Sequence, residues 1–181
     1  MKEHLKTSME ELDRLNLNEF KNAEKLPVVV VLDNIRSQSN TGSFFRTCDA
    51  FRIKKIYLCG ITATPPHREI QKTALGATET VDWEYSETTV KCLDHLKKEG
   101  YTLMAVEQTA SSTKLDDLQT KHLHPIALIF GNELDGVDQA VIDQCDQAIE
   151  IPQSGTKHSL NVSVAGGIVL WEIYKALYEQ L

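Results

Sequence analysis

The segment PVVVVLD, residues 27–33, constrains the fold more than any other part of the chain. A continuous run of β-branched side chains has no polar face, so it suits a strand that is buried on both faces, as in a parallel sheet covered by helices. Five similar runs follow it. The further strands are expected at KIYLCG near Ile56, TETVDW near Val81, YTLMAVE near Leu103, PIALIFG from Pro125 and AIEIP from Ala148.

Helical spacing characterises the residues between these runs. Helices are expected over residues 42–51, 86–99, 138–145 and about 160–179. Ser86 is a suitable N-cap and Gly100 a suitable C-terminal stop for the second of them. An amphipathic helix is also expected over about residues 2–15. The alternation of strands and helices predicts an α/β fold in which helices cover both faces of a mostly parallel sheet.

The size and composition of the chain favour one compact domain. Of 181 residues, 41% are hydrophobic, which is enough to bury a sizeable core. We expect a single domain over residues 1–181, with a short N-terminal helical extension of about residues 1–26. No stretch approaches the roughly 20 apolar residues of a membrane span, and the first residues mix charge with leucine rather than forming an export signal. The chain is therefore expected to be soluble and cytoplasmic.

Neither cysteine nor histidine spacing indicates a metal site. The four cysteines are far apart and form no C-x-x-C pair, so we expect free thiols rather than a zinc site or a disulfide framework. His122 and His124 could pair on a metal, but no third ligand lies near them in the sequence. A solvent-exposed strand edge is the simpler interpretation of this pair.

Charge is distributed unevenly along the chain. The net charge is −7, which argues against a nucleic-acid contact over the whole surface. Residues 36–72, however, contain seven basic and two acidic residues, a net charge of +5. This third of the chain is either an ordinary solvated face or the contact surface for a polyanion.

The chemistry is expected in the loops that follow strands, because ligands of parallel α/β sheets bind beyond the carboxyl ends of the strands. Three such loops are rich in polar residues and glycine: NIRSQSNTGSFFRTCDAF, GNELDGVD and IPQSGTKHSLN. The second lacks the Lys-Ser/Thr of a Walker loop, and no G-x-G-x-x-G follows the first strand. No G-x-S-x-G elbow surrounds Ser159. These absences exclude a conventional nucleotide loop and a serine hydrolase.

Each loop offers candidate ligand-binding side chains. Asn40 is expected to cap the helix after the first strand and to face the same ligand as Arg46, although a capped helix with an exposed arginine is the alternative. Asn132 and Glu133 place an amide and a carboxylate at the carboxyl edge of the sheet, unless they form only an exposed turn. Ser159 and Asn161 can both accept hydrogen bonds at the start of the last helix. Capping needs one such residue, so the pair suggests a ligand.

Taken together, SNTGSFFRTCDAF, LIFGNELDGV and IPQSGTKHSLNVSVA resemble the three ordered motifs of the SpoU branch of the SPOUT superfamily, the S-adenosyl-L-methionine-dependent RNA ribose 2′-O-methyltransferases. The resemblance covers about residues 27–180 and is nearest to the tRNA-guanosine methyltransferases. It implies that the C-terminal part of the α/β fold is threaded into a deep trefoil knot, an exception to the rule against knots.

The resemblance also implies a role for each matching residue. Arg46 would be central to catalysis and Asn40 would support it, with Glu133, Ser159 and Asn161 orienting them. Main-chain groups of Gly131, Ile151 and Leu160 would bind the adenine and ribose of the cofactor. An arginine stays protonated, so a clamp on phosphate and on the forming alkoxide suits Arg46 better than a general base. The candidates for RNA contact are Arg36, Arg46, Arg52 and Lys72.

The same resemblance implies a homodimer with the last helix in the interface. That helix is apolar over too wide an arc for a one-sided surface helix, and Gly166 and Gly167 would allow close approach of two backbones. A core helix within one subunit is the alternative. Three other functions are open at this point: a SPOUT base methyltransferase acting on guanine, a non-catalytic RNA-binding factor on the same fold, and an unrelated flavodoxin-like binding module. No membrane or metal partner is expected.

Overall fold

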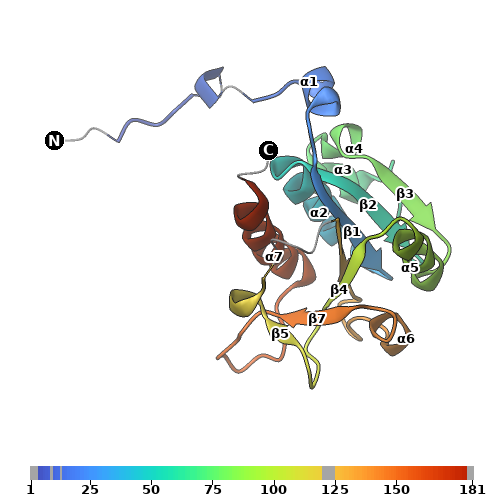
Figure 1. The fold of residues 1–181 in the computed structure, drawn as a ribbon. Coiled ribbons are helices and arrows are strands. Elements are labelled where there is room, and N and C mark those ends of the chain that lie inside the picture. The colour runs from blue at the N-terminus through green and yellow to red at the C-terminus, as the bar shows by residue number, and fades with distance from the viewer. Residues whose placement is uncertain (1–3, 9, 13, 120–124, 179–181) are drawn as a thin grey trace.

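A seven-stranded, wholly parallel sheet forms the centre of the protein (Figure 1). The computed structural model describes residues 4–8, 10–12, 14–119 and 125–178. The strands are β1 (Leu26–Asp33), β2 (Ile53–Cys59), β3 (Trp83–Ser86), β4 (Thr102–Val106), β5 (Thr113–Lys114), β6 (Ile126–Phe130) and β7 (Gln147–Glu150). Their order in the sheet is β3-β2-β1-β6-β4-β7-β5. The predicted α/β class and parallel sheet are confirmed.

Helices cover both faces of this sheet. Phe44 of α2 (Gln38–Ala50) and Val169 of α7 (Val162–Leu177) join the core on one face with Val28 and Val30, whereas Leu93 of α5 (Thr89–Lys98) joins Val29 on the other. Successive β1 side chains therefore enter opposite cores, as expected for a strand buried on both faces. The helices are α1 (Leu17–Asn22), α2 (Gln38–Ala50), α3 (Arg68–Ala74), α4 (Ala77–Thr80), α5 (Thr89–Lys98), α6 (Gln139–Ile142) and α7 (Val162–Leu177), with 3-10 turns η1 (Glu10–Leu12) and η2 (Leu115–Asp117).

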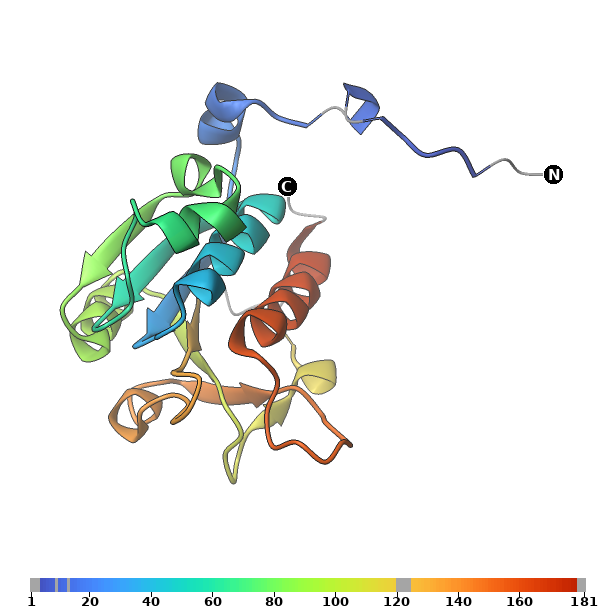
Figure 2. The same cartoon turned by 180° about the vertical axis from the view of Figure 1, so that it is seen from behind.

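The predicted N-terminal helix over residues 2–15 is wrong. Of the residues described in that range, only those of η1 are helical, and the described residues extend away from the body of the protein (Figures 1 and 2). The helix that forms is α1, which begins after Asn16. The Asn16 side chain accepts hydrogen bonds from the backbone N–H groups of Asn18 and Glu19, and the Glu19 carboxylate accepts one from the Asn16 backbone N–H, a complete capping box. A short helix without a cap or a packing surface is not stable alone.

Three further boundaries differ from the sequence prediction. The strand expected at Val81 lies later, at β3, because residues 77–80 form α4 instead. Ser86 ends β3, and Thr88 rather than Ser86 caps α5. Asn40 does not cap α2: Ser37 does, accepting from the Asn40 backbone N–H at 3.2 Å, and Asn40 lies in the first helical turn. At α5 and α2 a Ser or Thr side chain other than the predicted one accepts from the free N–H groups of the helix start.

Helices α2 and α7 lie side by side on one face of the sheet, as Figure 2 shows. Their close approach depends on Gly166, where an added Cβ would lie 2.3 Å from Cε1 of Phe44. Phe44 in turn packs on Phe130, with 5.0 Å between ring centroids. Gly166 therefore serves packing within the chain, which corrects its expected role between two chains. At Gly167 no heavy atom lies within 4 Å of such a Cβ.

The described residues contain no helix long and apolar enough to cross a membrane. Among the same residues, no group of three or more His, Cys, Asp or Glu side chains is arranged to hold a metal ion. His122 and His124 lie outside the described residues.

Candidate active site

A cavity of about 620 Å³ lies at the carboxyl edge of the sheet, where β4, β6 and β7 end. Val106, Phe130 and Glu150 are the last residues of those strands, and all three line it. The remaining walls come from the loop after β6 and from the segment between β7 and α7. Two of the three predicted loops, those after β6 and β7, therefore line the cavity themselves.

Glu133, in the loop after β6, ties that loop to the start of α2. Its Oε2 accepts a hydrogen bond from the Arg36 backbone N–H at 2.9 Å, and its Oε1 accepts from the Ser37 N–H at 3.0 Å. The Asn40 side-chain Nδ2 also donates to Oε1, at 2.9 Å. A carboxylate thus meets free N–H groups at a helix N-terminus, where negative charge is stabilised. This arrangement connects the first predicted loop with the second.

Asn40 continues the connection to the third loop. Its Oδ1 accepts a hydrogen bond from Asn161 Nδ2 at 3.2 Å and lies 3.3 Å from Ser163 Oγ. Asn161 caps α7, with Oδ1 accepting from the backbone N–H groups of Ser163 at 3.0 Å and Val164 at 3.3 Å. Asn40 is 9% exposed, and both ends of its amide are engaged. Its observed function is to hold the loops together.

The pKa of Glu133 reflects these contacts. Burial opposes ionisation of the carboxyl, but the hydrogen bonds from Arg36, Asn40 and Ser37 outweigh it and lower the pKa from its usual value. The group is therefore a fixed carboxylate at neutral pH. It acts as a hydrogen-bond acceptor rather than as a proton donor.

Two glycines shape the loop after β6. Asn132 and Gly136 form an isolated antiparallel bridge, with backbone hydrogen bonds of 2.9 Å in both directions. A Cβ at Gly131 would lie 2.1 Å from the Gly136 carbonyl carbon, and Gly136 itself has a φ of +71°. A Cβ at Gly131 would displace backbone, and one at Gly136 would displace the Glu107 carboxylate and strain a backbone of positive φ. The loop can therefore curl back and form the cavity wall.

Most of the predicted site residues meet at this cavity. Gly131, Ile151 and Leu160 line it, as do Glu133, Ser159 and Asn161. Asn40 adjoins it through its bonds to Glu133 and Asn161. Leu160 is 38% exposed, an apolar side chain open to a ligand.

Arg46 is the exception. It lies on the exposed side of α2, almost two turns after Asn40, and is not among the residues of this chain that line the cavity. Residues six apart on a helix differ by about 240° in direction, so Asn40 and Arg46 do not share a face. The expectation that both face one ligand is not met within the single chain.

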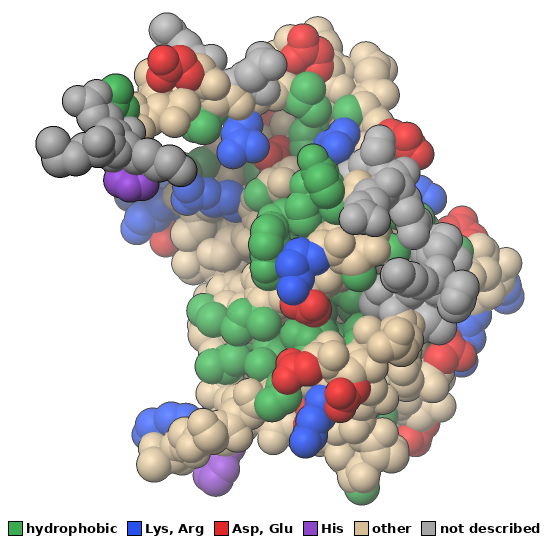
Figure 3. All heavy atoms as spheres, turned by 60° about the vertical axis from the view of Figure 1, so that its left-hand side comes forward, with side chains coloured by type: hydrophobic (Ala, Val, Ile, Leu, Met, Phe, Trp, Pro, Cys, Tyr) green, Lys and Arg blue, Asp and Glu red, His purple; other side chains and the backbone are tan. Residues whose placement is uncertain are grey.

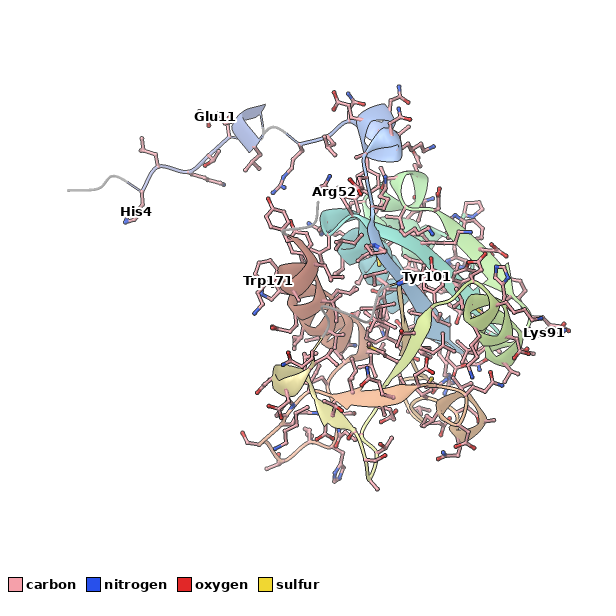
Figure 4. The ribbon with its side chains drawn as sticks, in the orientation of Figure 1. His4, Glu11, Arg52, Lys91, Tyr101 and Trp171 are labelled. Carbon is pink, nitrogen blue, oxygen red and sulfur yellow. The ribbon has the colours of Figure 1, made fainter. Side chains whose placement is uncertain are left out.

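The candidate RNA-binding residues are also divided in space. Arg36 is exposed just after β1, at the carboxyl edge of the sheet. Arg52 lies at the opposite edge, where its carbonyl oxygen accepts a hydrogen bond from the backbone N–H of Leu26, the first residue of β1 (Figure 4). Lys72 is exposed on α3, and its Nζ lies 3.8 Å from Oε2 of Glu69. Arg36 and Arg52 therefore flank the two ends of α2, and the assignment of these residues to RNA contact stays a prediction.

Glu107 and Gln108 are cavity residues that the sequence analysis did not identify. Glu107 Oε2 accepts from the Val137 backbone N–H at 3.0 Å, and Gln108 Nε2 donates to the His158 carbonyl oxygen at 2.9 Å. The two side chains thus brace both loops that form the cavity. Their position directly after a buried strand is the signal that could have identified them.

Comparison with known proteins agrees with this architecture. The chain matches the model of the SpoU rRNA Methylase family over residues 27–171. It is 30% identical to the 23S rRNA (guanosine-2′-O-)-methyltransferase RlmB of Vibrio vulnificus, covering 90% of this chain and 64% of that protein. It is 34% identical to the tRNA (guanosine(18)-2′-O)-methyltransferase TARBP1 of Mus musculus, covering 80% of this chain and 9% of that protein. The chain thus spans less than two thirds of the length of these curated relatives.

Solved structures show the same fold. The TrmH/SpoU tRNA modifying enzyme of A. aeolicus superposes with a TM-score of 0.80 at 28% identity, covering 91% of this chain and 82% of that one. The AdoMet-bound rRNA methyltransferase of Sinorhizobium meliloti superposes with a TM-score of 0.78 at 26% identity, covering 90% of this chain and 60% of that one.

The fold and the cavity together define an α/β protein with a ligand site at the carboxyl edge of a parallel sheet, built by motif loops rather than by a glycine-rich phosphate loop. The chain belongs to the SpoU rRNA Methylase family. The trefoil knot, which concerns how the chain is threaded, stays a prediction.

Proposed function

We propose that this chain transfers a methyl group from S-adenosylmethionine to a ribose 2′-hydroxyl of tRNA or rRNA. The observation that carries the proposal is the hydrogen-bonded series Glu133–Asn40–Asn161, which joins all three family motifs beside one cavity. The match to the SpoU rRNA Methylase family over residues 27–171 supports methyl transfer to RNA as the reaction at this cavity.

The residues of the cavity fit the cofactor. Ile149, Ile151 and Leu160 offer apolar contacts for an adenine ring, and carboxylates in the walls suit the positive charges of a sulfonium and an ammonium group. No lysine or arginine is among the described residues that line the cavity, so it does not suit a phosphate-bearing cofactor. We assign the main-chain groups of Gly131, Ile151 and Leu160 to the adenine and ribose.

The cofactor, when bound, supplies a methyl group activated by a positively charged sulfur. The chain's own residues then have to hold a ribose hydroxyl in line with that methyl group, and such positioning alone contributes several kcal/mol to catalysis. Glu133, Asn40 and Asn161 keep the loops fixed for this purpose. Arg46 clamps the adjacent phosphate and stabilises the negative charge that develops on the ribose oxygen.

We further propose that the protein acts as a homodimer through α7. One side of this helix packs in the core, but Val164, Ile168 and Trp171 are 52%, 39% and 49% exposed. Trp171 stacks on Tyr174, with 5.9 Å between ring centroids. Figure 3 shows hydrophobic side chains gathered on the face of the protein that α7 occupies. A contiguous apolar patch of this kind typically marks an interface.

A dimer would also explain why Arg46 lies outside the cavity of its own chain. Since Arg46 is exposed and lies outside the cavity of its own chain, we propose that it completes the cavity of the partner protomer. Its helix, α2, packs directly against the proposed interface helix α7, which supports this assignment. Each active site would then contain residues of two chains.

Guanosine in tRNA is our proposed target. Two relatives support the base: the mouse protein at 34% identity and the Vibrio protein at 30% are both guanosine 2′-O-methyltransferases. The slight preference for tRNA rests on the mouse protein and on the fold match to the A. aeolicus tRNA modifying enzyme.

Methyl transfer to purified RNA tests the proposal. The protein is incubated with tritium-labelled S-adenosylmethionine and separate tRNA and rRNA fractions, and the product is hydrolysed in alkali. A ribose 2′-O-methyl group blocks cleavage at its nucleotide, so we expect the label in alkali-resistant dinucleotides that contain guanosine. Label that appears in ordinary mononucleotides would indicate base methylation and contradict the proposal.

A further inference from the structure

Four carboxylates line the cavity, from three different parts of the sheet edge. Glu107 follows β4, Glu133 and Asp135 lie in the loop after β6, and Glu150 ends β7. Among the described residues that line the cavity, none is a lysine or an arginine. The cavity is therefore strongly negative. This is notable because RNA, the other proposed substrate, is itself a polyanion.

Three of these carboxylates are held in place by hydrogen bonds. Glu107 Oε2 accepts from the Val137 N–H at 3.0 Å and its Oε1 from the Gln108 N–H at 2.9 Å. Glu150 Oε2 accepts from Ser112 Oγ at 2.9 Å. Glu133 is fixed by the start of α2. A fixed charge keeps its distance to a bound ligand, so it distinguishes ligands that differ only in charge.

We propose that these carboxylates select the charge of the ligand, binding the cationic methyl donor in preference to its neutral thioether product. This inference rests on the proposed function. In the transfer, the S–C bond to the methyl group breaks and its electron pair stays on sulfur, while the methyl carbon bonds to the ribose oxygen and the hydroxyl proton passes to solvent. The sulfur therefore loses its positive charge, and the attraction of the four carboxylates for the ligand falls in the same step.

The expected size of the effect follows from Coulomb's law. For a carboxylate about 7 Å from the sulfur, with an effective dielectric constant of about 40 to 80 for an open, partly solvated cavity, each charge changes the affinity about three- to sevenfold. The product lacks the positive sulfur and keeps only the adjacent ammonium and carboxylate of its amino-acid end, whose charges sum to zero, so neutralising a carboxylate should leave its affinity nearly unchanged. Added salt should weaken donor binding for the same reason.

Calorimetric titration of the full chain measures this selection without any methyl transfer. The ligands are S-adenosylmethionine, S-adenosylhomocysteine and the unreactive analogue sinefungin, which carries an amine in place of the sulfonium. The main variants are Asp135→Asn, whose side chain is exposed, and Glu150→Gln, with Glu107→Gln as a third. Glu99→Gln is the matched control, because it removes one exposed carboxylate, at the C-cap of α5, that lies outside the cavity.

We expect each cavity variant to weaken both cationic ligands about three- to sevenfold and to leave S-adenosylhomocysteine within about twofold of wild type. The control should bind all three ligands as wild type does. Equal weakening of all three ligands by the cavity variants would show that these residues act through loop shape, and would overturn the inference while leaving the proposed function intact. Failure of the wild-type protein to bind any of the ligands would overturn the cofactor assignment and the inference with it.

Discussion

Two adjacent glycines of α7 should respond to the same substitution with opposite signs. A Cβ at Gly166 would lie 2.3 Å from Cε1 and 2.7 Å from Cζ of Phe44, whereas carbon atoms in contact are normally 3.5–4.0 Å apart. The Phe44 ring is 1% exposed and packs on Phe130, so it has no free space to move into. Gly166→Ala must therefore separate α7 from α2.

The magnitude can be estimated from two opposing effects. Overpacking a core typically costs about 1–3 kcal/mol, whereas replacing glycine by alanine inside a helix stabilises by about 1 kcal/mol. Gly166→Ala should therefore lose up to about 2 kcal/mol of unfolding free energy. Gly167→Ala, which has open space around its Cβ, should gain about 1 kcal/mol.

Urea unfolding followed by circular dichroism measures both variants, at several protein concentrations so that any dimer contribution is seen. The displacement of α7 should also pull Asn161 away from Asn40, so Gly166→Ala should bind S-adenosylmethionine more weakly than Gly167→Ala does. Stabilisation by both substitutions would refute the argument, because it would mean that α2 and α7 do not approach closely at Gly166.

Three other predictions follow from the site. Leu160→Glu should abolish S-adenosylmethionine binding, because it places a charge on an apolar wall; normal affinity by calorimetry would exclude Leu160 from the pocket. Glu133 has a lowered pKa, so its contribution to stability is present above its unfolded-state value near 4.5 and is lost as pH falls through the lower folded-state value. Glu133→Gln should thus be less stable than wild type at pH 7, with a smaller loss of stability on acidification below about pH 4.5, and parallel acid-unfolding curves would contradict this. If Arg46 completes the partner's cavity, mixing inactive Arg46→Ala with inactive Leu160→Glu and allowing subunit exchange should restore about a quarter of wild-type activity, since half of the dimers are mixed and each has one intact site; no recovery would place Arg46 in its own chain's site.

Local patterns in the sequence predicted the fold class well. The run at residues 27–33 is buried on both faces, as its lack of a polar side requires, and five of the six predicted strand positions coincide with strands of the sheet. The order of the strands was not predictable in this way. It depends on contacts between segments far apart in the chain, such as β1 with β6, which no local pattern encodes.

Errors occurred where two local signals compete. Residues 2–15 have helical spacing, but their described side chains are exposed rather than packed on a core, and α1 forms beside them at the better cap, Asn16. Asn40 and Ser37 are both good N-caps, and spacing alone could not show that the Asn40 amide is used by Glu133 and Asn161 instead. Long-range hydrogen bonds decided its role.

The sequence predicted which loops form the candidate site, but it did not predict the negative charge of the cavity. Gly131, Ile151 and Leu160 line one cavity, as the motif resemblance implied. The carboxylates of Glu107 and Glu150 were not anticipated, because each belongs to a different strand and only the sheet order brings them together. The separation of Arg46 from Asn40, by contrast, follows from helical periodicity, because residues six apart in a helix differ by about 240° in direction.

The central claim is that Arg46 is needed for methyl transfer but not for cofactor binding. Measuring both properties in Arg46 variants tests it most directly. Arg46→Ala and Arg46→Lys are assayed for transfer of tritium-labelled methyl groups to RNA, and their affinity for S-adenosylmethionine is measured by calorimetry. We predict that Arg46→Ala lowers the rate of methyl transfer at least about a hundredfold while binding the cofactor as wild type does. Arg46→Lys should restore little of this rate, because a lysine ammonium cannot make the bidentate contact to phosphate that a guanidinium makes. Wild-type turnover by Arg46→Ala on an RNA that the native protein methylates would contradict the account.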